Sequence, residues 1–143
     1  PLQSNKTKLV AEHADWVHSI DRIKIAQRLN DQRPAALAKL KVLLQINISA
    51  EDTKAGIAAS DMLSLAAAIS ALPQLELKGL MAIPAPGHSE SAFAAMQQLS
   101  IQLQQHYPQA SELSMGMSDD WPLALTYGAT MIRLGTAIFG ARS

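Results

Sequence analysis

The segment Lys41–Ile48, with the sequence K-V-L-L-Q-I-N-I, constrains the fold more than any other stretch of the chain. Its apolar residues are nearly continuous, which is typical of a strand that is covered on both faces. Such strands belong to parallel sheets whose connecting helices pack on the sheet. This run therefore predicts an α/β protein.

Apolar strands and amphipathic helices alternate along the chain at roughly 25 to 30 residues per unit, the spacing of a parallel α/β sheet. Four further strands are predicted at Trp16–Ile20, Leu75–Ile83, Glu112–Met117 and Thr130–Leu134. Helices are predicted from Ser4 or Asn5 to about Ala14, from a cap at Asp21 to about Gln32, from a cap at Ser60 to the stop at Pro73, from Ser89 or Ser91 to about His106, and across Trp121–Tyr127.

Five strands do not close a barrel, which needs eight. The predicted sheet is therefore either open and doubly wound, or part of a barrel whose upstream strands are absent. The chain opens at Pro1 without a Met, and this favours a fragment of a barrel.

The composition indicates a globular domain, with 48% hydrophobic and 17% charged residues among 143. The 12 basic and 12 acidic side chains balance, so no nucleic-acid or acidic-membrane partner is expected. The absence of cysteine excludes disulfides and Cys-based zinc sites, and the four histidines show no metal spacing. No long apolar span or secretory leader is evident, so a cytoplasmic protein is expected.

Two turns near the C-terminus carry the residue types that a phosphate site needs. The residues that follow the last two predicted strands are Ser118, Asp119 and Asp120 in the first turn and Gly135, Thr136 and Ala137 in the second. Small residues let a ligand approach the backbone, and N–H groups at a helix start attract an anion. In a (β/α)₈ barrel, phosphate commonly binds after the last two strands. The alternative is that both are ordinary strand-to-helix turns in which Ser118 caps the next helix.

Five motifs in order resemble the YggS/PROSC proteins: L-Q-S-N-K, Q-I-N-I-S with E-x-x-K-x-G just after, G-L-M-A-I-P, L-S-M-G-M-S-D-D and R-L-G-T-A-I-F-G-A-R. These are pyridoxal phosphate homeostasis proteins, related to the barrel domain of alanine racemase. The resemblance implies a TIM barrel of fold type III that binds pyridoxal 5′-phosphate (PLP). Residues 1–143 would form a single domain, approximately strands four to eight of that barrel.

The resemblance also implies roles for individual residues. It places Ser118, Gly135 and Thr136 at the phosphate, Arg133 near the pyridine nitrogen and Met81 beside the ring. The family's Schiff-base lysine lies on the first strand in an S-K-T-K-P-like motif. That motif and the family's G-E-N-Y segment are absent from this sequence.

The chemistry of the side chains adds to this interpretation. A charge in the apolar segment around Arg133 is costly unless it is paired, so a partner at a ligand is expected. Lys54 could visit the cofactor mouth or be solvated, and Asn47 could point into the barrel mouth or satisfy a backbone group. Asp119 and Asp120 are expected to cap a helix rather than act as acids. His18 is expected to be a hydrogen-bonded core histidine.

The predicted function is that of a PLP carrier or homeostasis protein without strong catalytic activity, with PLP-dependent apoenzymes as candidate recipients. One alternative is an enzyme of the alanine racemase class. It would need a second acid/base group, which in that family comes from an additional C-terminal β domain, and the sequence stops at Ser143. Another alternative is a phosphate-binding barrel unrelated to PLP.

Overall fold

A computed structural model of the chain describes residues 2–48, 56–85 and 87–133. Strands and helices alternate along these residues, so the predicted α/β class is confirmed. The strands are β1 (Trp16–Ile20), β2 (Leu40–Gln45), β3 (Leu75–Met81) and β4 (Glu112–Ser114). The helices are α1 (Thr7–His13), α2 (Ile23–Gln32), α3 (Met62–Ser70), α4 (Ser89–His106) and α5 (Trp121–Thr126), with 3₁₀ turns η1 (Ser4–Lys6) and η2 (Ala59–Asp61) ahead of α1 and α3.

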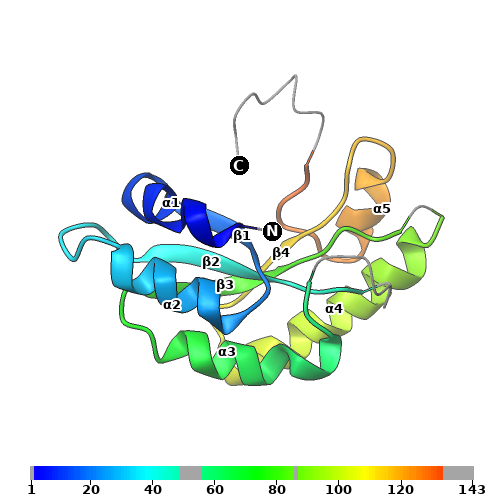
Figure 1. Ribbon diagram of the computed structural model, residues 1–143. Coiled ribbons are helices and arrows are strands. Elements are labelled where there is room, and N and C mark those ends of the chain that lie inside the picture. The colour runs from blue at the N-terminus through cyan, green and yellow to red at the C-terminus, as the bar shows by residue number, and fades with distance from the viewer. Residues whose placement is uncertain (1, 49–55, 86, 134–143) are drawn as a thin grey trace.

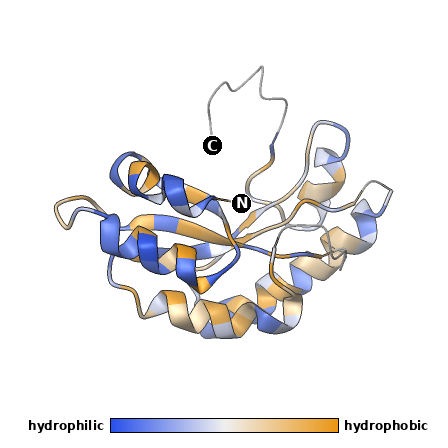
Figure 2. Cartoon of the chain, in the orientation of Figure 1, coloured by the Kyte–Doolittle hydropathy of each residue, from blue (hydrophilic) through white to orange (hydrophobic). Residues whose placement is uncertain are grey.

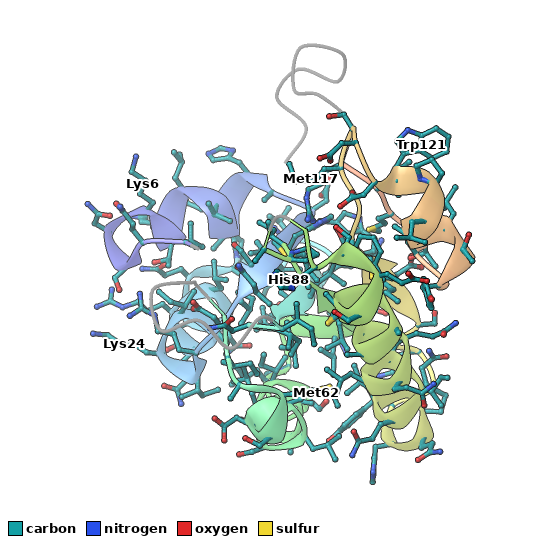
Figure 3. All side chains as sticks on the ribbon, turned by 90° about the vertical axis from the view of Figure 1, so that its right-hand side faces the viewer. Lys6, Lys24, Met62, His88, Met117 and Trp121 are labelled. Carbon is teal, nitrogen blue, oxygen red and sulfur yellow. The ribbon has the colours of Figure 1, made fainter. Side chains whose placement is uncertain are left out.

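The strands form one parallel sheet in the order β1-β2-β3-β4, so each strand pairs with the next strand along the chain. Helices α2, α3 and α4 lie on one side of this sheet (Figure 1). In the view turned by 90°, the helices follow an arc around the strands, and the arc is open on the side away from α3 (Figure 3). A doubly wound sheet reverses its strand order part-way. The described strands show no reversal, which favours the barrel-type arrangement over the doubly wound one.

The hydrophobic core lies between the sheet and the helices on its outer side. Leu44 and Leu80, which are paired in register on β2 and β3, point into this core. Apolar residues are concentrated in the sheet, and hydrophilic residues are spread over α1 and α2 (Figure 2). None of the described helices is long and apolar enough to cross a lipid bilayer. The buried apolar residues of the helices include Ile25, Ala26 and Leu29 on α2, Met62, Leu65, Ala66 and Ile69 on α3, and Phe93, Met96 and Leu103 on α4.

The opposite face of the sheet, called the inner face below, carries a second set of side chains. Gln45 of β2, Met81 of β3 and Ser114 of β4 lie next to one another in register, and all three are buried. They stand at the carboxyl ends of their strands, the edge at which parallel α/β proteins bind ligands. This edge is therefore the place where the predicted site residues should meet.

The ends of the predicted strands differ from those observed. β2, β3 and β4 stop at Gln45, Met81 and Ser114, before the expected ends at residues 48, 83 and 117. In the predicted strand 130–134, Met131 forms only an isolated parallel bridge with Ser114, and residue 134 lies outside the described residues. Gly116 explains the early end of β4, because its φ of +100° turns the chain away from the extended conformation.

The predicted caps of α2 and α3 are wrong, whereas α4 begins at Ser89 as predicted. The residues at the N-cap positions are Arg22 for α2 and Asp61 for α3, and neither side chain makes a capping hydrogen bond. Ser60 lies inside the 3₁₀ turn that leads into α3. Tighter i→i+3 bonds satisfy backbone groups at a helix end, so such an entry does not require a side-chain cap.

Candidate functional site

A cavity of about 700 Å³ opens on the inner face of the sheet. One wall comes from β1 and the segment before it, and includes Trp16 and His18. The other wall includes Met81 from β3 together with Met131 and Arg133. Most of the lining side chains are apolar, while Arg133 brings a permanent positive charge to the cavity wall.

The hydrogen bonds of Arg133 to described residues fix it at the cavity wall. Its backbone N–H donates to the carbonyl oxygen of Gly116 over 2.9 Å. In its side chain, Nη1 donates to Ser114 Oγ over 2.8 Å and Nη2 donates to the carbonyl oxygen of Ala82 over 3.0 Å. Both of these side-chain acceptors are uncharged, so these two bonds orient the guanidinium group by hydrogen bonding and not by charge pairing. The polar partners required for this charge are thus protein oxygens beside the cavity.

Met81 lines the same cavity and is only 6% exposed. Its backbone carbonyl accepts the N–H of Ile46 over 2.9 Å, and its Cα pairs with Ser114 across the sheet. The structure therefore brings together two of the predicted site residues, Met81 and Arg133, at the wall of one cavity.

Ser118 is exposed in the turn between β4 and α5 and is not part of the cavity wall. Asp120 holds this turn, because its Oδ1 accepts the Met117 N–H over 2.7 Å and its Oδ2 accepts the Ser89 hydroxyl over 2.7 Å. Asp120 occupies the N-cap position of α5 but makes no capping bond to that helix. The expectation that it caps the helix is wrong, since its carboxylate ties the turn to α4 instead.

Three predicted site residues, Lys54, Gly135 and Thr136, lie outside the described residues. Asn47 lies shortly before residues 49–55 in the sequence and is half-buried. Its backbone N–H donates to the carbonyl oxygen of Ile57 over 2.8 Å. Gly56 has a φ of +114°, and a Cβ there would lie 2.7 Å from the backbone nitrogen of Asn47. The glycine of the E-x-x-K-x-G motif is thus required for close backbone packing beside β2.

Sequence analysis missed Ser114 and misplaced His18. Ser114 is completely buried in an apolar strand. A buried hydroxyl needs a hydrogen-bond partner, so a serine in this apolar run was the sequence signal that could have pointed to its role.

His18 is half-buried on the cavity wall rather than in the core. Its ring stands edge-on to that of Trp16, with 6.0 Å between the ring centroids. Alternation along β1 places both rings on one side of the strand, which the sequence could have shown.

Residues 2–143 match the family described as alanine racemase, N-terminal domain. The chain belongs to this family. The match covers nearly the whole chain and confirms the resemblance carried by the five motifs.

Similar proteins of the alanine racemase N-terminal domain family include two named pyridoxal phosphate homeostasis protein. The one from Haemophilus influenzae is 58% identical over 149 residues, which is 100% of this chain and 63% of the relative. The one from Escherichia coli is 56% identical over 147 residues, which is 99% of this chain and 62% of the relative. The chain thus spans less than two thirds of the length of these relatives.

Among solved structures, PipY of Synechococcus elongatus with PLP bound is similar to this chain. The two are 39% identical and superpose with a TM-score of 0.82, covering 98% of this chain and 68% of PipY. The parallel sheet with its helices is therefore an alanine racemase-like α/β fold.

Proposed function

We propose that this chain binds PLP and serves in intracellular PLP homeostasis, as a cofactor carrier without strong catalytic activity. The names of the two relatives and the PLP bound to PipY support this role. PLP-dependent apoenzymes in the cytoplasm are the recipients that such a role implies. The observation that carries the proposal is the fixed guanidinium group of Arg133 beside Met81 at the end of a cavity.

The cavity residues fit this cofactor in shape and charge. The thioether of Met81 suits the face of an aromatic ring. The guanidinium group of Arg133 can only donate hydrogen bonds, so it suits a pyridine nitrogen that is unprotonated and accepts. Bound PLP supplies an electron sink, which is weaker when that nitrogen carries no proton. Arg133 therefore favours holding the cofactor over demanding carbanion chemistry.

The phosphate is assigned to Ser118, Gly135 and Thr136, as the family resemblance implies. Ser118 is exposed and its hydroxyl makes no hydrogen bond within the described part of the chain, so it is available as a donor. The bonds made by Asp120 keep this turn in place without using Ser118. Lys54, which follows β2 in the sequence, is assigned to the mouth of the site.

We also propose that residues 1–143 form one domain, approximately strands four to eight of a (β/α)₈ barrel. Sequential parallel pairing and helices on one side of the sheet are the features of such a barrel. Barrel closure would cover the inner face and enclose the cavity.

A fluorescence titration of the chain with PLP tests this function. We expect saturable but weak binding, because the Schiff-base lysine motif of the family is absent from residues 1–143. Arg133→Gln should weaken binding and shift the absorption of bound PLP, whereas Arg28→Gln, on the exposed surface of α2, should change neither. Ser118→Ala should weaken binding by about 1.5–3 kcal/mol, the value of a hydrogen bond to a charged acceptor.

Two results would contradict the proposal. The first is the absence of saturable PLP binding by the parent chain. The second is displacement of PLP by an equal concentration of a sugar phosphate, which would indicate a phosphate-binding barrel unrelated to PLP.

A further inference from the structure

We propose that Ser114 is a positioning residue of this site, whose hydroxyl holds the Arg133 guanidinium group in the direction that sets the electronic state of a bound pyridine ring. The inference rests on the function proposed above. It extends that function to a residue that is not part of the cavity wall.

The burial and hydrogen bonding of Ser114 hold the Arg133 guanidinium group in one orientation. The residue is 0% exposed, and its Oγ accepts Arg133 Nη1 over 2.8 Å. Burial removes water as a competing partner, which strengthens the bond and makes its loss costly. The second nitrogen, Nη2, donates to the Ala82 carbonyl oxygen over 3.0 Å. Because the guanidinium group is planar and rigid, two acceptors on two nitrogens fix both its position and its rotation.

The two acceptors belong to one rigid unit. The backbone N–H of Ala82 donates to the carbonyl oxygen of Ser114 over 3.1 Å, and the Cα of Ser114 pairs with that of Met81. The sheet therefore fixes the guanidinium group of Arg133 relative to Met81, the other predicted ring contact. A site supported in this way is held more accurately than one carried by loops alone.

The chemistry of serine is suited to this position. A carboxylate in its place would neutralise the guanidinium charge and reduce its effect on a bound ring. An alanine would remove this acceptor and loosen the orientation of the guanidinium group. A hydroxyl orients the cation without neutralising it.

The first test measures the orientation of Arg133 without any cofactor. Phenylglyoxal modifies accessible guanidinium groups, and peptide mass spectrometry gives the rate at Arg133 separately from the other arginines. Ser114→Ala should raise that rate by about threefold or more, since the lost bond to a charged donor is among the stronger kinds. Ser100→Ala is the matched control, because it removes another buried hydroxyl, one that accepts Gln104 Nε2 over 3.0 Å on α4.

The second test records the absorption spectrum of bound PLP between pH 6 and 9. Ser114→Ala should shift the spectrum and its pH dependence, while Ser100→Ala should match the parent. Ser114→Cys keeps the size of the side chain but is a poor acceptor, so it should reproduce the shift even if the alanine variant folds poorly.

The outcomes separate this inference from the proposed function. Parent-like Arg133 reactivity in both Ser114 variants would overturn the positioning role, whatever PLP does. Altered reactivity with a parent-like spectrum would also overturn it, because orientation would then not matter to the ring. If the parent binds no PLP, the proposed function fails, and with it the role assigned to Ser114 toward a pyridine ring.

Discussion

Gly116 combines an unusual backbone conformation with very close packing. Its φ is +100°, and a Cβ at this position would lie 2.7 Å from the Cβ of Ala124 on α5. Gly116 was predicted to lie within the strand 112–117. In the structure it lies beyond the end of β4, and α5 packs directly against the chain there.

Gly116→Ala should lower the free energy of unfolding by about 2–4 kcal/mol, because a left-handed conformation and an overpacked contact add together. Gly87→Ala is the matched control: its φ is +82°, but nothing lies within 4 Å of the added Cβ. That variant should lose only about 1–2 kcal/mol in a urea melt. Equal losses for the two variants would show that packing against α5 adds nothing.

Tyr127 carries a pH-dependent contact between the end of α5 and the start of α4. Its hydroxyl donates to Glu90 Oε2 over 2.9 Å. This hydrogen bond raises the pKa of Tyr127 above its ordinary value, and burial and the charge of Glu90 add smaller increases. The protonated hydroxyl is therefore the form that the folded chain favours.

The stability contributed by this contact should be fully present below the ordinary tyrosine pKa of about 10 and lost as the pH rises through the raised folded value. The urea midpoints of the parent and Tyr127→Phe should therefore differ by a constant amount from pH 7 to 9 and converge above pH 10. A difference that persists unchanged to pH 11 would contradict the role of the hydroxyl. Glu90→Gln removes the charge and serves as the comparison.

Among the helices, α1 and α2 are joined by Arg33, a residue whose role the sequence did not reveal. Arg33 follows α2 and is only 6% exposed. Its guanidinium group donates to the carbonyl oxygens of Ala11, Ala14 and Ala38 at distances between 2.6 and 3.0 Å. These acceptors lie at the end of α1 and in the segment before β2, so one side chain connects three parts of the chain.

Arg33→Ala should lower the free energy of unfolding by about 2–4 kcal/mol, because it removes the charged donor of one buried and three part-buried hydrogen bonds. Arg33→Lys should recover little of this, since an ammonium group cannot reproduce the planar fork. Arg28→Ala, on the exposed surface of α2, should stay within about 0.5 kcal/mol of the parent in the same melt. Full recovery with lysine would mean that charge alone is sufficient.

The sequence predicted the regular elements well and their ends less well. β1 and α4 have the predicted bounds, because an apolar run bounded by turn residues and an 18-residue amphipathic pattern are both strong local signals. The strand ends depended on tertiary contacts. Beyond Gln45, for example, Ile46 bridges to Ile57, and no local pattern reveals such pairing.

For the molecule as a whole, the open inner face predicts that residues 1–143 alone tend to associate with one another. β1 pairs with β2 on one side only within the described sheet, and an apolar cavity stands open beside it. Unpaired strand edges next to apolar surface favour association between chains. Residues 1–143 alone should therefore be aggregation-prone or loosely packed, in keeping with the weak PLP binding expected above.

Light scattering, thermal unfolding and borohydride trapping with PLP measure this behaviour. A monodisperse monomer with sharp cooperative unfolding and a stable covalent PLP adduct would contradict the partial-barrel proposal. An increase in scattering with protein concentration would agree with it.

The placement of Met81 and Arg133 at the same site could be predicted, because the carboxyl ends of parallel strands share one edge of the sheet. The family resemblance supplied the identities of the two residues. The role of Ser114 could not be predicted, because it depends on the register between β3 and β4 and on a bond to a segment outside β4. Register is set by packing across the sheet rather than by local sequence.

The sequential order of the strands also has a consequence for how the chain acquires its structure during synthesis. Each strand pairs with the one made just before it, so every new βα unit that leaves the ribosome finds its neighbour already present. The loops to be closed stay about one unit long, which keeps the entropic cost of each step small. The described strands can therefore be added one at a time in chain order, and the Arg133 contacts with Ala82 and Ser114 form after both acceptors are already in the sheet.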